Sequence, residues 1–330
     1  MKTPALLLVV TAGVSVTPLP LPGGEGGIGF DDLRFSAELH RVIVPAGASG
    51  RLDLVDPKTR AVDAIAGFST APQRQRGHSQ GTTSADSGGG LIFASDRTAG
   101  TLVIIDPAAR RILASVRLGG GPDYVRWVAP SREVWVSEPG AKVIEMFRLE
   151  QKEAPALVRV GTIELADGPE SLEIDASRRR AYSNTWHDAT VSIDLQSRKI
   201  VERWPNGCEG ARGLALDVAR GFAFVGCTEG KAVSLDVEHG GKILGQAAAG
   251  KGVDVIAFAP GLSHLYVPGP EAATLTVMSV GARGQLDVLG SAATASDAHC
   301  VTADESGNAW ICDPGKGRLL EFRDPYPASR

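Results

Sequence analysis

The 330-residue sequence predicts an all-β fold, a seven-bladed β-propeller, and three observations support this prediction. A five-residue frame, seen in Asp123-Tyr124-Val125-Arg126-Trp127, returns in copies that begin at residues 31, 81, 123, 170, 212, 254 and 299. Eight residues after the end of each copy lies an apolar or aromatic residue: Ile43, Phe93, Trp135, Tyr182, Phe224, Tyr266 or Ile311. A third column follows eight or nine residues later: Leu52, Leu102, Val143, Val191, Val233, Leu275 or Leu319. Columns that stay in register through seven copies indicate a supersecondary unit of about 42 residues, the length of a four-stranded propeller blade.

The ends of the chain indicate how the ring closes. Each copy consists of short alternating segments separated by Gly, Pro, Asp and Ser, which is typical of short strands joined by tight turns. The seventh copy ends soon after Leu319-Leu320-Glu321-Phe322 and lacks a fourth strand of its own. Residues 13–21 precede the first frame as residues 158–165 precede the fourth, so we expect them to form the outer strand of the last blade and to cover two free sheet edges. The predicted unit is therefore a single propeller domain, residues 13–330.

The charge and hydropathy of the chain argue against two kinds of partner. The formal net charge of −4 argues against a nucleic acid, because phosphate binding requires clustered Lys and Arg. No stretch reaches the ~20 consecutive apolar residues of a membrane span. The HExxH motif of a large class of zinc hydrolases is also missing from the sequence.

The N-terminus and the cysteines favour export. Lys2 followed by the apolar residues 5–10 is typical of the start of a secretory signal, with cleavage near residue 12, so residues 1–12 are a possible signal segment. Cys300 and Cys312 lie at equal distances from a predicted hairpin turn, and Cys208 and Cys227 bracket the first hairpin of the fifth copy. We expect two disulfides, with four buried free thiols as the alternative. Neither pair has CxxC spacing, so a structural zinc site is not expected, and disulfides would suit a periplasmic or secreted protein.

Two predicted blades share a turn between their third and fourth strands. The turns read Asp56-Pro57-Lys58-Thr59-Arg60-Ala61-Val62 and Asp106-Pro107-Ala108-Ala109-Arg110-Arg111-Ile112. Asp followed by Pro suits a type I turn. With an apolar strand before this turn and a Val- or Ile-led strand after it, the blades resemble the YVTN-type repeats of the YncE-like propeller family over residues 31–323. The resemblance implies the propeller fold rather than one activity, because the family is diverse. Blades three and six depart from the Asp turn and have longer connections.

The strongest functional signal is the first position of the frame, where the chain enters each innermost strand. This column consists of Asp31, Gly81, Asp123, Glu170, Arg212, Asp254 and His299, with His78 shortly before Gly81. The innermost strands of a propeller surround a channel, so these side chains should meet at one of its mouths. We therefore predict that the column lines a site for a small ligand or a metal.

Several functions are compatible with such a column. Carboxylates that lie close together need a cation, a shared proton or Arg212 between them. Ca²⁺ or Mg²⁺ would suit the oxygen ligands, and His299 would allow Zn²⁺ or Mn²⁺. The first hypothesis is an exported scaffold that binds a small ligand or a partner protein over one face. The alternative is a metal-dependent lactonase or esterase in the channel, as in propellers of the gluconolactonase type, although the Asn of their ligand set is missing from this column. Hydrated, mutually paired charges without a ligand are a third interpretation.

Two loops are further candidates. Residues 69–80 lengthen the first step between frames and would form either a lid over the column or an ordinary surface loop. His187, beside Trp186, falls on a turn of the fourth blade and would be either a ligand contact or part of a packed loop.

Overall fold

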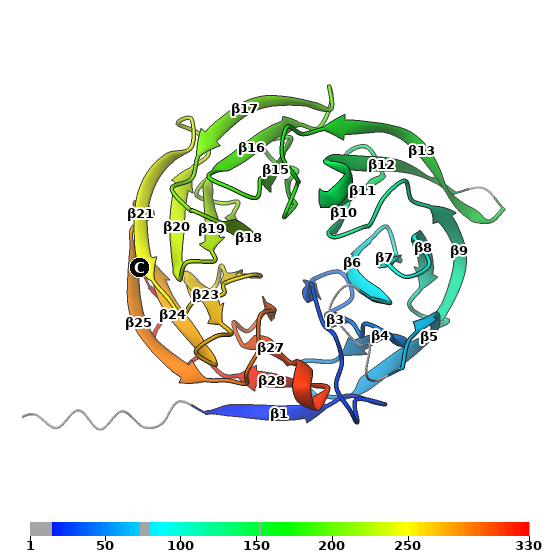
Figure 1. The fold of residues 1–330 in the computed structure, drawn as a ribbon, viewed down its shortest axis with the longest axis horizontal. Helices are drawn as coiled ribbons and strands as arrows, with labels where there is room; N and C mark the ends of the chain where they lie inside the picture. The colour runs from blue at the N-terminus through cyan, green and yellow to red at the C-terminus, as the bar shows by residue number, and fades with distance from the viewer. Residues whose placement is uncertain (1–14, 73–79, 152, 330) are drawn as a thin grey trace, which may run out of the picture.

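The computed structural model describes residues 15–72, 80–151 and 153–329 and confirms the seven-bladed β-propeller (Figure 1). Each blade is a four-stranded antiparallel sheet, and blades are numbered here in chain order. Blade one contains β2 (Arg34–Ser36), β3 (Arg41–Pro45), β4 (Ser49–Val55) and β5 (Val62–Thr70). Blade two contains β6 (Thr82–Gly88), β7 (Leu91–Asp96), β8 (Thr101–Asp106) and β9 (Arg111–Arg117). Blade three contains β10 (Val125–Val128), β11 (Glu133–Glu138), β12 (Val143–Gln151) and β13 (Pro155–Glu164).

The remaining blades repeat this order. Blade four contains β14 (Glu173–Asp175), β15 (Arg180–Asn184), β16 (Ala189–Asp194) and β17 (Lys199–Pro205). Blade five contains β18 (Ala211–Asp217), β19 (Phe222–Cys227), β20 (Lys231–Asp236) and β21 (Lys242–Ala248). Blade six contains β22 (Ala257–Ala259), β23 (His264–Gly269), β24 (Thr274–Val280) and β25 (Leu286–Ala293). Blade seven contains β26 (Val301–Ala303), β27 (Ala309–Asp313), β28 (Arg318–Phe322) and β1 (Val16–Pro20).

The N-terminal strand closes the ring as predicted. β1 pairs antiparallel with β28, from Val16 opposite Phe322 to Pro20 opposite Arg318. Arg60 of blade one reinforces the closure, since its Nη2 donates to the carbonyl oxygen of Pro18 at 2.7 Å and its Nη1 contacts Glu321. The possible signal segment, residues 1–12, lies outside the described residues.

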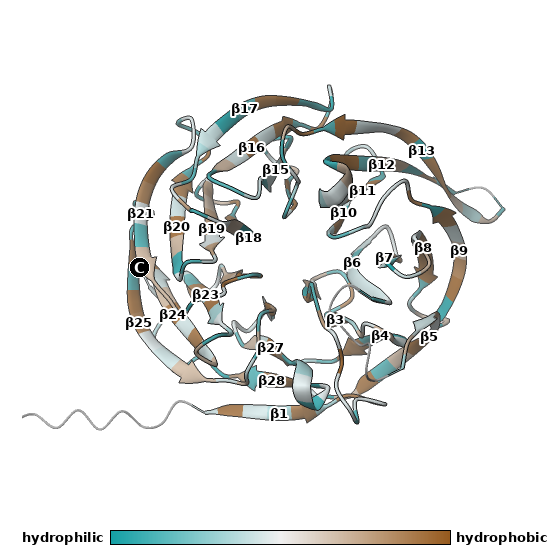
Figure 2. Cartoon of the chain, viewed as in Figure 1, coloured by the Kyte–Doolittle hydropathy of each residue, from teal (hydrophilic) through white to brown (hydrophobic). Residues whose placement is uncertain are grey.

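The apolar columns of the sequence form the core between blades. All six residues of β11 are buried, whereas the outer strand β9 has no fully buried residue. The second and third strands of each blade face a neighbouring blade on both sides, so their sequences are nearly continuous runs of apolar residues. Trp135, Tyr182 and Tyr266 of the second column are each no more than 1% exposed. Along the outer strands hydrophobic and polar residues alternate, as Figure 2 shows.

Both predicted disulfides are present, in blades five and seven. Cys208 pairs with Cys227 at a Cα–Cα distance of 5.3 Å, and Cys300 pairs with Cys312 at 5.6 Å. Each disulfide joins the residue before or near an innermost strand to the second strand of the same blade. The disulfides therefore stiffen the innermost part of these two sheets.

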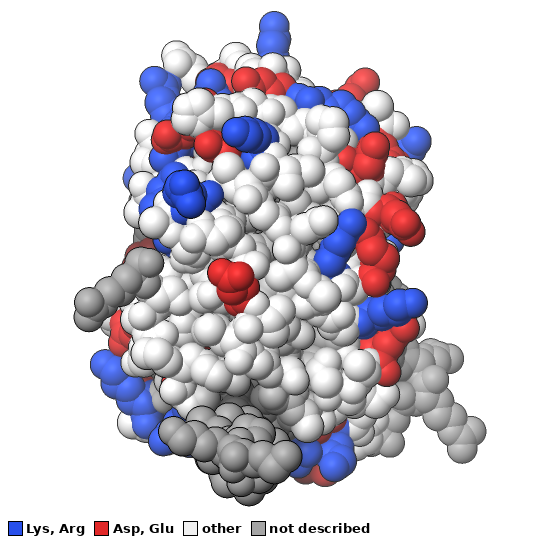
Figure 3. All heavy atoms as spheres, turned by 90° about the vertical axis from the view of Figure 1, so that its left-hand side faces the viewer, with Lys and Arg blue, Asp and Glu red and all other residues white. Residues whose placement is uncertain are grey.

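The flank over β21 and β25 is largely uncharged (Figure 3). Isolated Lys and Arg lie there among Asp and Glu, and on this face the basic residues do not gather into the patch that a phosphate backbone would require. Within the described chain, no helix has the length and apolar character that crossing a membrane requires.

Candidate functional site

The first frame position brings its side chains to one mouth of the channel. Asp31, Asp123, Glu170, Arg212 and Asp254 line a cavity of about 690 Å³. A second cavity of about 620 Å³ contains Glu170, Arg212 and Asp254 again and adds His299. The two cavities share three side chains and are therefore adjacent, and we call them together the acidic mouth. Six of the predicted site residues meet there.

Gly81 is the one member of the column without a side chain, and the backbone explains why. Its φ is +69°, and a Cβ at this position would lie 2.1 Å from the carbonyl oxygen of Gly47. The backbone of Gly47 occupies the space beside Gly81. The backbone N–H of Arg97 donates to the carbonyl oxygen of Gly81 at 2.7 Å, and Arg97 lines the mouth.

Arg97 and Trp186 are two residues of this mouth that the sequence analysis missed, and Glu271 and Asp297 of the 620 Å³ cavity are two more. Arg97 Nη1 lies 3.3 Å from Asp31 Oδ2, and its Nη2 lies 3.5 Å from Asp123 Oδ1. Trp186 Nε1 donates to Glu170, and Arg212 Nε lies 3.2 Å from the other oxygen of the same carboxylate. A further column of the repeat would have revealed Arg97 and Trp186. Arg97 lies 16 residues after Gly81, and Trp186 lies 16 residues after Glu170. The other blades place Gly47, Pro139, Thr228, Pro270 and Gly315 at that spacing.

Burial and mutual repulsion disfavour negative charge at the acidic mouth. The pKa of Asp31 is raised well above its usual value, chiefly by burial and then by Asp254, although Arg97 and His299 lower it. Burial and Asp31 likewise raise the pKa of Asp123. The pKa of Glu170 is raised by burial and by Asp254, against the lowering effect of Arg212 and Trp186. The two arginines therefore do not fully compensate these carboxylates.

His299 is a cation in this arrangement. Its Nδ1 lies 2.7 Å from the carbonyl oxygen of Asp297, and its Nε2 lies 3.1 Å from the carbonyl oxygen of Phe30. Carbonyl oxygens only accept hydrogen bonds, so both ring nitrogens must donate and the ring is an imidazolium. Burial lowers the pKa of His299, but the hydrogen bonds to Asp297 and the charges of Asp254 and Asp31 raise it to about 9.

The donor set does not fit a preformed metal cage. Both ring nitrogens of His299 lie against carbonyl oxygens, so the contribution of His299 to a Zn²⁺ or Mn²⁺ site stays a prediction. Among the described residues, the groups of three ligating side chains with atoms within 4.8 Å of one another are His299–Cys300–Cys312 and Cys208–Cys227–Glu229. Each contains both sulfurs of a disulfide, which are not thiolates. The carboxylates of the acidic mouth are spread more widely than a Ca²⁺ ligand sphere requires.

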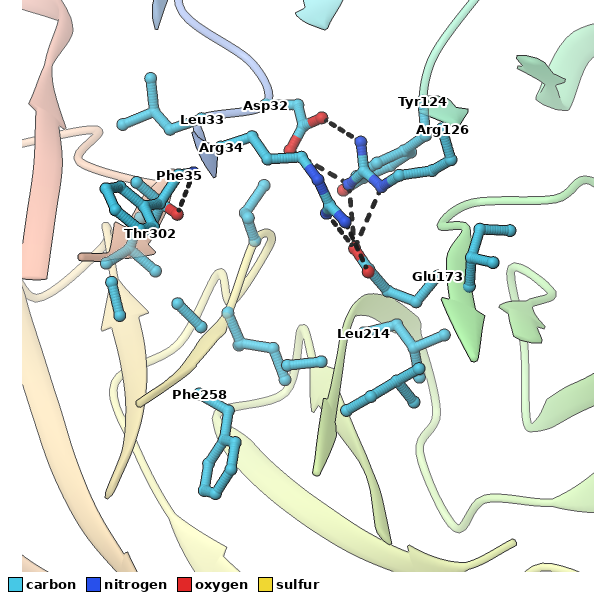
Figure 4. Close-up of a pocket in the computed structure, with 18 of the residues that line it drawn as sticks. Asp32, Leu33, Arg34, Phe35, Tyr124, Arg126, Glu173, Leu214, Phe258 and Thr302 are labelled. Carbon is cyan, nitrogen blue, oxygen red and sulfur yellow. Dashed lines mark hydrogen bonds and ion pairs between the residues drawn. The ribbon is translucent and has the colours of Figure 1, made fainter. Parts of the chain in front are cut away.

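A buried polar layer of ion pairs lies in the channel, on the side of blades one to four (Figure 4). Arg126 Nη1 lies 2.6 Å from Asp32 Oδ2, and the Arg126 guanidinium also contacts Glu173 at 3.1 Å. Arg34 Nη1 lies 2.8 Å from Glu173 Oε1, and Arg34 Nε lies 3.0 Å from Asp86. These ion pairs connect blade one with blades two, three and four across the channel. Sequence reasoning missed the layer, although Arg34, Arg126 and Glu173 all occupy the fourth frame position.

The structure describes one of the two loop candidates, His187, and only part of the other, residues 69–80. His187 is exposed at the rim, and its Nδ1 lies 2.6 Å from Asp167 Oδ2. His78 and most of the proposed lid, residues 73–79, lie outside the described residues. The prediction of a lid therefore stays a prediction.

The fold and this channel define the class: a seven-bladed β-propeller with one acidic mouth. Solved structures with the same fold include a chain of hydrazine synthase from Kuenenia stuttgartiensis, with 12% identity, a TM-score of 0.74 and coverage of 92% of this chain and 97% of that chain. A chain of a mitotic checkpoint complex has 14% identity, a TM-score of 0.75 and coverage of 98% and 99%. The β-propeller domain of Cps50 (Swd1) from Myceliophteria thermophila has 11% identity, a TM-score of 0.71 and coverage of 90% and 98%.

These similarities show the fold alone, because a propeller hosts many unrelated functions. No protein-family model matches the chain, and a search of curated proteins finds no match either. Membership of the YncE-like family therefore stays a prediction.

Proposed function

We propose that this chain is an exported, noncatalytic propeller of the YncE-like kind that binds a small organic cation at the acidic mouth. The observation that carries the proposal is the convergence of four carboxylates on one cavity whose arginines are both already paired: Asp31, Asp123, Glu170 and Asp254 face Arg97 and Arg212. Glu271, Asp297 and the His299 imidazolium line the second cavity of the mouth, so six negative groups face three positive ones and full ionisation leaves an excess of negative charge. An ammonium group would supply the missing positive charge in a partly buried site, where charge pairs are poorly screened.

The dimensions and walls of the mouth suit a small molecule. Its two cavities, about 690 and 620 Å³, have the size of typical ligand pockets. Trp186, Pro139 and Pro270 add apolar surface at the rim. An alkylammonium ligand could place its charge among the carboxylates and its hydrocarbon part against Trp186, the aromatic ring with the strongest attraction for cations.

Export is supported by the cysteines. All four are paired, and disulfides persist mainly in oxidising compartments. A partner protein over one face is a broader form of the same proposal, since a Lys side chain offered by a partner would satisfy the same carboxylates. One similar structure is a chain of a mitotic checkpoint complex, which is an example of a propeller within an assembly.

A metal-dependent lactonase or esterase is the alternative, and the geometry favours it less. Such an enzyme needs a metal held by several converging ligands to activate a water. Both ring nitrogens of His299 lie against carbonyl oxygens, and the described carboxylates do not converge in threes within 4.8 Å.

The two functions are separated by a thermal-unfolding titration. Butylammonium chloride and tetramethylammonium chloride should each raise the melting temperature of the wild-type protein above that in NaCl of equal ionic strength, whereas CaCl₂, MnCl₂ and ZnCl₂ should not. Asp123→Asn and Glu170→Gln should each abolish the response to the organic cations. The matched control is Asp63→Asn, which removes a carboxylate paired with Arg110 on the outer surface and should leave the response unchanged. A stoichiometric divalent ion that both variants release would instead support the hydrolase.

A further inference from the structure

The opposite mouth of the channel holds a second cavity, of about 290 Å³, that the proposed function does not use. Residues of the buried polar layer line part of its wall, and it shares only Tyr124 with the 690 Å³ cavity of the acidic mouth. We call it the amphipathic pocket, because one half of its wall is charged and the other half is apolar. Figure 4 shows Arg34, Arg126 and Glu173 on one side, with Leu214 and Phe258 across from them.

The apolar half comes from three consecutive blades. Blade five provides Leu214 and Leu216, blade six provides Ile256 and Phe258, and blade seven provides Val301. Phe258 and Leu216 are only partly buried, and the ring of Phe258 packs against Phe224. A cavity of ~150 Å³ lined by apolar residues is enough to hold benzene. The amphipathic pocket has roughly twice that volume, which suits a body of about two fused rings.

The charged half holds three carboxylates and two guanidiniums, and each of these five groups is paired within 3.1 Å, which limits the charge of any ligand. Glu173 is buried, which raises its pKa, but Arg34 and Arg126 outweigh burial and hold the pKa below its usual value. Two guanidinium groups face Asp32, Asp86 and Glu173 within 3.1 Å. A carboxylate ligand would add repulsion with three acids, and an ammonium ligand would lie beside two guanidiniums. Either would enter a site with no free counter-charge, which is unfavourable at this burial.

Hydrogen-bonding capacity remains in this wall at Arg34 and Glu173. An arginine has five N–H donors, and Arg34 uses three of them within the described chain: Nε to Asp86 and one each from Nη1 and Nη2 to Glu173. Glu173 Oε2 accepts the bond from Arg34 Nη2 at 3.2 Å and can accept another. The Arg34 side chain is 27% exposed and that of Glu173 is 15% exposed, so a ligand can reach both. A hydroxyl or an amide can accept from Arg34 and donate to Glu173 at the same time.

We infer that the amphipathic pocket is a second ligand site, specific for an uncharged molecule with an aromatic or alicyclic body of about two rings and one hydroxyl or amide group. The body packs against Leu216 and Phe258, and the polar group bonds with Arg34 and Glu173. This site is distinct from the cation site, because the amphipathic pocket shares only Tyr124 with the cavities of the acidic mouth.

The test uses three probes of the same shape on the full chain: 2-naphthol, 2-naphthoate and 2-naphthylmethylammonium. At neutral pH the inference predicts that 2-naphthol binds with one-to-one stoichiometry in calorimetry and at least about tenfold more tightly than either charged probe, a difference of ~1.4 kcal/mol. Comparable affinity for all three probes, or no binding of 2-naphthol, would overturn it.

Two variants locate the binding. Leu216→Gln removes apolar contact from the wall and should weaken 2-naphthol at least about fivefold, whereas the matched Val201→Gln, on the exposed side of β17, should have no effect. Ala303→Phe fills the pocket and should abolish binding even if the first variant unfolds. Asp123→Asn should leave 2-naphthol binding unchanged, so failure of the cation proposal does not count against this one. Unaltered affinity in both pocket variants would place the probe elsewhere and refute the assignment.

Discussion

Asp123 lies where burial and neighbouring acids oppose its negative charge. Its raised pKa means that the folded state holds a proton more tightly than the unfolded chain does. The stability that this proton binding provides is present at acid pH and is lost as the pH rises past the unfolded value of 3.8 and through the folded pKa. A negative charge on Asp123 therefore lowers the stability of the folded state near neutral pH, as is common for ionisable groups that serve in ligand binding.

We expect Asp123→Asn to be more stable than the wild type at about pH 8, by ~1 kcal/mol, and the difference to shrink toward about pH 4. Urea unfolding across this pH range measures it. Asp63→Asn, at a side chain 47% exposed, should stay within about 0.5 kcal/mol of the wild type throughout. A destabilised Asp123→Asn protein at the alkaline end would mean that Arg97 compensates the charge fully.

The titration of His299, which is a cation when protonated, adds a second pH dependence to the stability of the protein. Its folded pKa of about 9 lies above the ordinary value of 6.5, so its stabilising contribution is complete below 6.5 and is lost as the pH rises through about 9. His299→Gln should therefore lower stability at about pH 6 by up to ~3 kcal/mol and differ little from the wild type at about pH 10. Guanidinium unfolding of both proteins at several pH values tests this. A destabilisation that does not vary with pH would indicate lost packing rather than a lost imidazolium.

At the scale of elements, β1 determines whether the ring is closed. It covers the free edge of β28, and Leu19 is only 8% exposed. Removing residues 1–20 should lower the free energy of unfolding by at least about 2 kcal/mol, the usual contribution of one buried leucine, and expose an edge prone to aggregation. Removing residues 1–12 is the matched control and should leave the melting temperature unchanged. Equal stability of the two truncated proteins would show that the closure contributes nothing.

The disulfide of blade seven, between Cys300 and Cys312, should also contribute measurably to stability. Its cysteines are 12 residues apart, and crosslinking a loop of about this size stabilises by ~3 kcal/mol in the chain-entropy model. The double variant Cys300→Ser/Cys312→Ser should lose about that much, and reductant should have a similar effect on the wild type. The cysteines of the disulfide in blade five are 19 residues apart. The stabilisation from this disulfide should differ only slightly from that in blade seven, because the loop-closure entropy grows with the logarithm of loop length. A melting temperature insensitive to reductant would contradict this.

The elements themselves were largely predictable from the sequence. The frame fixed the positions of the innermost strands because backbone periodicity and turn residues are local properties. β1 as the fourth strand of blade seven followed from a missing strand at the other end of the chain. Arg97 was harder to find, since its column is mostly Gly, Pro and Thr.

On the scale of the whole molecule, the channel contains two hollows, the acidic mouth and the amphipathic pocket. The sequence predicted that the first frame positions meet at one mouth, and the structure brings six of them there. The sequence did not predict the buried polar layer, because the pairing of Arg34 with Glu173 joins residues 139 apart and depends on the diameter of the ring. Such distant pairings follow from the closed geometry and not from any local pattern.

Proton release on ligand binding tests the central claim most directly. If an ammonium group compensates Asp31, Asp123 and Glu170, its binding must lower their pKa values and release protons to the solvent. Calorimetric titration of butylammonium at about pH 6, in two buffers with different ionisation enthalpies, measures the number released. We predict different heats in the two buffers for the wild type, and no binding by Asp123→Asn. Equal heats in both buffers, together with undiminished binding by Asp123→Asn, would contradict a cation site at the acidic mouth.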